Sequence, residues 1–153
     1  MSAAQSPPAE PGFSECNCLA IRQAARHVTQ FYDQHLAPSG LRTTQFGILT
    51  RLRRSGPMTI NELAAALVMD RTTLGRNILP LQRDGLVEVA PGVTDRRRRE
   101  LRVTQRGLER QRAGVQGWIE AQQRFSEVFG GERAAALREM LRAVTGSDFA
   151  GAA

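Results

Sequence analysis

The segment from Thr59 to Gly85 constrains the fold more than any other part of the chain, because it specifies two helices with almost no room between them. Thr59 stands three residues before Glu62, and this spacing is a capping-box signature for the start of a helix. Asp70, three residues after the apolar Leu67, can cap a second helix. We therefore expect two helices joined by a tight turn, with Gly85 in a left-handed cap after the second.

The second of these helices, expected over 71–84, is predicted to have a buried side and an exposed side. Leu74, Ile78 and Leu81 recur at helical spacing, so we expect them to face the core. The outward side carries Thr72, Thr73, Arg76 and Asn77. Pro80 lies in the second half of this helix, where a proline removes a backbone hydrogen bond. We expect a kink or a loosened hydrogen-bond ladder there, away from the exposed first half.

Four consecutive arginines, Arg96–Arg99, stand between two segments in which apolar and polar residues alternate. Taken alone, this basic block fits a disordered tail or a solvated charged surface. The alternating segments, 86–90 and 100–104, predict instead the two strands of a β-hairpin. Because the connecting segment is too long for a two-residue turn, we expect the arginines on a protruding tip.

Apolar residues at helical spacing predict further helices on both sides of this region. Their expected ranges are 16–36, 44–54, 105–129 and 132–145. Residues 1–13 are rich in proline and small residues and are expected to form a disordered arm, and residues 147–153 a flexible tail. The remainder, residues 14–146, has the length of a single domain. The predicted fold is therefore mainly α with a small β-hairpin, in the α+β class.

The charge of the chain points to an acidic partner. The net charge is +6, the pI is about 11.0, and all 21 basic residues are arginine. The planar guanidinium suits phosphate and base contacts, so nucleic acid is the leading class of partner, with an anionic membrane surface as the alternative. No apolar run approaches the ~20 residues that span a bilayer, and we expect a cytoplasmic protein.

The order of these elements is that of a helix-turn-helix followed by a β-hairpin wing. A helix fits the major groove of DNA, and an arginine-bearing hairpin suits a neighbouring minor groove. Two segments, TINELAAALVMDRTTLGRNILPLQRDGLVE and TDRRRRELRVTQRG, resemble the multiple-antibiotic-resistance regulator (MarR) family of winged-helix transcription factors. The family's wing pattern is present as Asp95, Arg96 and Arg97, then Val103 and Thr104, then Gly107. The resemblance covers about residues 16–145.

The resemblance implies which residues contact double-stranded DNA. Arg97 would enter the minor groove, and Asp95 would steady it by a charge-assisted hydrogen bond. The full set of implied DNA-binding residues is Arg71, Thr72, Thr73, Arg76, Asn77, Asp95, Arg96, Arg97 and Arg98.

The resemblance also implies a homodimer. The winged helix-turn-helix would occupy about residues 41–104, with dimerisation helices in 14–40 and 105–146. The sequence agrees, because long amphipathic helices at both ends need more cover than a winged core provides. A two-fold dimer would present two recognition helices about one DNA turn apart, ~34 Å, and read a pseudo-palindrome. We expect a repressor whose effector lowers its affinity for DNA.

Small aromatic acids and phenols often bind in this family between the dimerisation region and the DNA-binding lobe. Here we expect Arg22, Arg26 or His27 to pair with such an effector, and Trp118 to wall the pocket. Surface pairing or dimer packing of these side chains is the alternative.

Cys16 and Cys18 admit three interpretations. Cys18 is a small buried residue beside an exposed Cys16, or the thiols sense peroxide as in the organic-hydroperoxide branch of the family, or they bind a metal with His27 and His35. That branch activates its thiol with tyrosines on the second helix, and the matching stretch LRTTQFGIL has none. The four metal-ligating groups are spread along a helix and make a poor cage.

The sequence contains no arrangement typical of catalysis, such as a nucleophile with its base, a phosphate-binding loop or metalloenzyme spacing. We therefore predict neither an enzyme nor a cofactor. Two functions stand beside a ligand-released repressor: a regulator switched by oxidation of its cysteines, and a basic protein that coats nucleic acid without reading its sequence.

Overall fold

The computed structural model describes residues 12–151, which are mainly helical with one two-stranded antiparallel hairpin. The main elements are α1 (Asn17–Leu36), α2 (Thr43–Ser55), α3 (Ile60–Leu67), α4 (Arg71–Arg83), β1 (Val87–Pro91), β2 (Arg99–Val103), α5 (Gln105–Phe129) and α6 (Gly131–Gly146). Short 3-10 turns, Phe13–Glu15 and Ala37–Ser39, precede and follow α1. The predicted fold class is confirmed, and every predicted helix and strand begins and ends within one residue of its expected bounds.

The ends of the chain are described only in part. Of the predicted arm, 1–13, only Gly12 and Phe13 are among the described residues, and Phe13 belongs to the first 3-10 turn. Helix α6 ends at Gly146, immediately before the residues of the predicted tail, 147–153. Its last two residues, 152–153, lie outside the described part.

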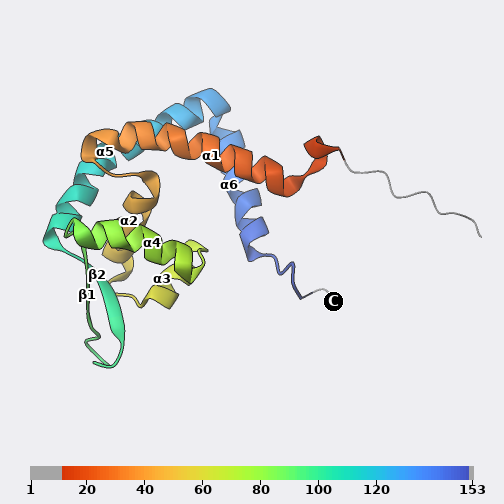
Figure 1. The fold of residues 1–153 in the computed structure, drawn as a ribbon. Coiled ribbons are helices and arrows are strands. Elements are labelled where there is room, and N and C mark those ends of the chain that lie inside the picture. The colour runs from red at the N-terminus through yellow and green to blue at the C-terminus, as the bar shows by residue number, and fades with distance from the viewer. Residues whose placement is uncertain (1–11, 152–153) are drawn as a thin grey trace, which may run out of the picture.

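Helix α5 joins two groups of elements (Figure 1). The helices α2, α3 and α4 and the hairpin gather near the start of α5, whereas α1 packs along it and α6 folds back from its end. The chain therefore has a small mixed lobe, formed by α2, α3, α4 and the hairpin, and a helical arm, formed by α1, α6 and the second half of α5. The continuous helix α5 connects the two.

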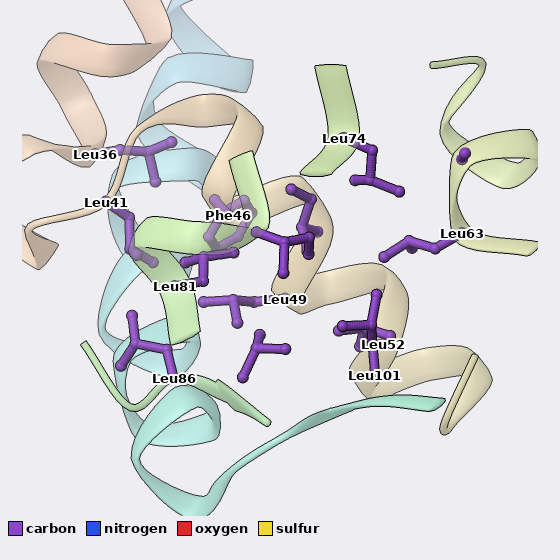
Figure 2. Close-up of a cluster of buried hydrophobic side chains, with 14 residues drawn as sticks. Leu36, Leu41, Phe46, Leu49, Leu52, Leu63, Leu74, Leu81, Leu86 and Leu101 are labelled. Atoms are coloured by element: carbon purple, nitrogen blue, oxygen red, sulfur yellow. The ribbon is translucent and has the colours of Figure 1, made fainter. Parts of the chain in front are cut away.

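Leucines from several elements build the core of the mixed lobe. Figure 2 shows side chains from α2, α3, α4 and β2 pointing toward one another, and these include Phe46, Leu49, Leu52, Leu63, Leu74, Leu81 and Leu101. The predicted inward positions on α4 are confirmed, since Leu74, Ile78 and Leu81 are all at most 3% exposed. Burying one such side chain contributes about 1.5–3 kcal/mol, so these contacts fix which side of α4 faces outward.

Backbone hydrogen bonds attach the base of the hairpin to the rest of the lobe. Strands β1 and β2 pair in antiparallel register with Val87 opposite Val103. Met58, just before α3, pairs with Leu101 on the other side of β2, with N–O distances of 3.2 and 2.7 Å. The hairpin is thereby held against the entry to α3.

The junction between the hairpin and α5 depends on Thr104 and Gly107. The Thr104 hydroxyl accepts a hydrogen bond from the Gly107 N–H and donates one to the Gly85 carbonyl, at 3.0 and 2.7 Å. A Cβ atom at position 107 would lie 2.1 Å from the Leu86 carbonyl oxygen, so only glycine permits this approach. The start of α5 is therefore locked to the end of α4.

Much of the apolar side of the helical arm is exposed in the single chain. Exposed fractions are 42% for Ile21, 38% for Trp118, 60% for Met140, 41% for Leu141 and 39% for Val144. Helical periodicity predicts an apolar stripe, but it does not say which chain covers it. None of the described helices is long and apolar enough to cross a membrane.

Replacing Leu49 by alanine is expected to lower the free energy of unfolding by about 2–5 kcal/mol, because its side chain is fully buried. Leu79→Ala on α4 is the matched control, since Leu79 is 64% exposed, and it should change stability by less than about 1 kcal/mol. Urea unfolding at one protein concentration measures both. Equal losses in the two variants would contradict the assigned core.

Candidate nucleic-acid interface

The start of α4 is set by Asp70, as predicted. Its Oδ1 accepts a hydrogen bond from the Thr73 N–H at 2.8 Å, and its Oδ2 accepts one from the Thr73 hydroxyl at 2.5 Å. These hydrogen bonds from the Thr73 side chain and backbone hold the pKa of Asp70 below its usual 3.8. The turn before it is tight because Val68 adopts a left-handed conformation, with φ of 53°, that is uncommon for a β-branched residue.

The predicted residues on the outward side of α4 fall into two groups, which differ in whether their side chains are hydrogen-bonded within the protein. Thr73 is engaged by Asp70, and the Asn77 side chain donates to the Thr73 carbonyl at 2.9 Å. The side chains of Arg71, Thr72 and Arg76 are exposed and make no hydrogen bond to any other described residue. These three therefore keep all their donors for a ligand, whereas Thr73 and Asn77 first shape the helix.

Pro80 does not end α4, which continues to Arg83. The Asp84 N–H still bonds to the Pro80 carbonyl at 3.0 Å. Gly85 follows with φ of 71°, which confirms the predicted left-handed cap.

Asp95 shapes the wing tip through hydrogen bonds to the backbone. Its Oδ1 accepts a hydrogen bond from the backbone N–H of Arg97 at 2.9 Å, and its carbonyl accepts one from the Arg98 N–H at 3.1 Å. The bond from the ionised carboxylate to Arg97 is charge-assisted, and it is made to the backbone of that residue. The carboxylate closes a local turn, as aspartate often does in loops, and leaves the Arg97 guanidinium exposed.

The four arginines of the tip are not equivalent. All are exposed, but Arg98 forms an ion pair with Glu62 of α3, with 2.5 Å between Nη2 and Oε1. Glu62 also completes the predicted capping box, since its Oε2 accepts the Thr59 N–H at 2.8 Å. Sequence reasoning missed this ion pair because the two residues are 36 positions apart.

The predicted effector residues are not brought together within one chain. Trp118 stacks on Phe46, with 6.5 Å between ring centroids, and the adjacent turn of α5 packs closely on His35 at the end of α1. Arg26 and Arg22 lie nine and thirteen residues before His35, about 14 and 20 Å along the helix. His27 is exposed beside Arg26, so the predicted cluster does not form a pocket with Trp118.

Both cysteines are exposed at the start of α1, which corrects the interpretation of Cys18 as a buried residue. Cys16 is the N-cap, and its sulfur accepts a hydrogen bond from the Leu19 N–H at 3.4 Å. Among residues 12–151 there is no group of three or more His, Cys, Asp or Glu able to hold a metal ion.

An exposed helix face and an arginine-bearing hairpin, both fixed to one leucine core, define a winged helix-turn-helix protein. Comparison with known proteins agrees: the family model described as "MarR family" matches residues 39–98. The solved structure of the Mycobacterium tuberculosis transcriptional regulator MosR is 33% identical, covers 89% of this chain and 100% of its own, and superposes with a TM-score of 0.74. The chain belongs to the MarR family and is a DNA-binding transcriptional regulator.

Two further relatives are informative. The structure of M. tuberculosis MosR in complex with DNA is 32% identical, covers 87% of this chain and 100% of its own, and has a TM-score of 0.72. The uncharacterized HTH-type transcriptional regulator YwoH of Bacillus subtilis (strain 168) is 35% identical over 72 residues. That match spans 47% of this chain and 53% of YwoH, about half the length of this curated relative.

Replacing Asp70 by asparagine should separate its two roles, capping and charge. Because its pKa is lowered in the folded protein, ionised Asp70 stabilises the fold above pH 3.8, and this contribution is lost as the pH falls through the folded pKa. Asparagine keeps the cap but does not titrate.

We therefore expect Asp70→Asn to retain the urea midpoint at pH 7 and to show a shallower decline toward pH 2. Asp70→Ala, which loses the cap, should lower the midpoint already at pH 7. A decline in Asp70→Asn as steep as in the wild type would contradict this assignment.

Proposed function

We propose that this protein is a homodimeric, sequence-specific repressor that reads pseudo-palindromic double-stranded DNA and is released by a small effector. One observation carries the proposal. The exposed donors of Arg71, Thr72 and Arg76 lie on the same lobe as the arginine tip of the wing, and both are held by one core. A rigid lobe with two such projections can engage two adjacent grooves at once.

In this proposal the two projections have different tasks. The first half of α4 enters the major groove, where Arg76 and Thr72 contact base edges and Arg71 contacts a phosphate. The wing reaches the neighbouring minor groove with Arg97 and Arg96, since a narrow minor groove has a strongly negative potential. Thr73, Asn77 and Asp95 act by holding these elements in shape.

The exposed apolar stripe of the helical arm supports the homodimer. Ile21, Met140, Leu141 and Val144 come from the two ends of the chain, as expected for α1 and α6 of two interleaved subunits. A second copy would cover these side chains with its own, in a self-complementary two-fold interface. We propose that residues 41–104 form the DNA-binding lobe and that the dimerisation helices lie in residues 14–40 and 105–146, where these exposed apolar side chains are found.

The route by which an effector would act runs through α5. This helix begins at Gln105, directly after its N-cap Thr104, which is bonded to Gly85 just beyond α4, and it ends among the arm helices. A small aromatic acid that changed the packing of the arm would rotate α5 and alter the spacing of the two recognition helices. Such an effector must change the affinity of the protein for its operator. An effector that bound tightly and left operator affinity unchanged would contradict the proposed coupling between the two sites.

Arg97→Ala is expected to weaken operator binding about tenfold or more, because a groove-inserted arginine is lost. Arg124→Ala is the control, since Arg124 is an exposed arginine near the far end of α5, paired with Glu127. Equilibrium binding to an operator selected from genomic DNA, with sedimentation to verify the dimer, measures both.

Excess unrelated DNA in the same assay tests sequence specificity. The proposal requires operator binding to survive this competitor with a ratio of order 10³ or more. A nucleic-acid-coating protein would show a ratio near one.

Equal losses of operator affinity for Arg97→Ala and Arg124→Ala would overturn the assignment of the wing.

A redox-switched regulator is the second candidate function. It is favoured by the exposure of Cys16 and Cys18, two residues apart at the first turn of α1. Treatment with an organic hydroperoxide should then release the wild-type protein from its operator and leave a Cys16→Ser, Cys18→Ser variant bound. Equal release of both proteins would exclude the thiols as the trigger.

A further inference from the structure

Glu62 makes two contacts with one carboxylate. Its Oε2 accepts the Thr59 N–H at 2.8 Å and so caps α3, while its Oε1 accepts Nη2 of Arg98 at 2.5 Å. The side chains of Glu62 and Arg98 are each 48% exposed. The carboxylate that starts the helix-turn-helix is therefore also bonded to the tip of the wing.

The tip otherwise bonds mainly to itself. Gly92 donates to the Arg98 carbonyl at 2.8 Å, and Asp95 closes the turn through its bonds to Arg97 and Arg98. The Met58–Leu101 pair attaches the base of the hairpin, two residues inside the strand. Among the described residues, the Glu62–Arg98 ion pair is the one hydrogen-bonded link from the 92–98 loop to the helix-turn-helix.

A carboxylate on a DNA-facing surface is unfavourable, because phosphates repel it. Capping does not require its charge, since glutamine serves equally at this position of a capping box. The charge of Glu62 is therefore best explained by its partner. An exposed ion pair adds little to the stability of the fold, so its effect lies in orientation.

We propose that Glu62 is a positioning residue for DNA recognition, which holds the wing tip by Arg98 so that Arg96 and Arg97 keep a set position relative to α4. This inference rests on the proposed role of the wing as a DNA-contacting element. It assigns Arg98 a task inside the protein, which distinguishes it from its neighbours in the arginine run.

Glu62→Gln tests the inference because it preserves the cap and removes the charge. Charge alone predicts tighter binding to every DNA, since one negative group is lost. Loss of positioning predicts the opposite for the operator. We expect operator affinity to fall about two- to fivefold, the size measured for exposed ion pairs, while affinity for unrelated DNA stays equal or rises.

Arg98 variants and a matched control complete the design. Arg98→Lys keeps an ion pair and should retain more operator affinity than Arg98→Gln. In an Arg98→Gln background, Glu62→Gln should no longer weaken operator binding, because the pair is already broken. Glu88→Gln makes the same charge change at an exposed site on β1 and should alter binding to both DNAs in one direction.

Amide hydrogen exchange without DNA separates this inference from the proposed function. The Arg97 and Arg98 amides should exchange faster in Glu62→Gln than in the wild type, with an unchanged melting temperature. Unchanged exchange, or tighter binding of Glu62→Gln to operator and unrelated DNA alike, would overturn the positioning role. A wild-type protein that fails to discriminate an operator would instead overturn the proposed function.

Discussion

The contacts between buried leucines of α2, α3, α4 and β2 hold together the two elements that we propose contact DNA, α4 and the wing. Leu74 and Leu81 anchor α4, and Leu101 anchors the hairpin, to the same cluster around Leu49. Because the interior is close-packed, neither projection can shift without disturbing the other. The outward face of α4 and the direction of the wing are thus consequences of one hydrophobic core, with hydrogen bonds refining the details.

The features predicted correctly from the sequence are those encoded over short distances. The caps at Thr59 and Asp70 need only a partner three residues on, and the buried face of α4 follows from helical spacing. The hairpin follows from alternation. Each of these features is specified by residues close together in the sequence, so the packing of distant segments did not change it.

The features that were missed or wrong depend on where separate elements meet. The Glu62–Arg98 ion pair joins two segments whose sequences say nothing of each other. The sequence predicted that Asp95 bonds to Arg97, but not whether it bonds to the backbone or the side chain, because loop geometry decides between them. Trp118 and Arg22 were both predicted to line an effector site, but Arg22 lies about 20 Å along α1 from His35, where that helix meets the turn of α5 next to Trp118.

The proposed regulation depends on two features, the exposed apolar stripe of the helical arm and the continuous helix α5. Ile21 and Leu141 are apolar at helical spacing and uncovered in the single chain, while Thr104 and Gly107 lock α5 to the end of α4. A change in arm packing would therefore be carried directly to the DNA-reading lobe. In the proposed dimer, the affinity for DNA would depend on the separation of the two lobes that such arms join.

Footprinting of the protein on operators selected from genomic DNA tests this account most directly. Two symmetric protected half-sites, with centres about 10–10.5 base pairs apart and wing contacts in the flanking minor grooves, are the predicted result. Uniform protection of unrelated sequences, with no enriched inverted repeat, would contradict the claim that this winged lobe reads DNA as a two-fold dimer.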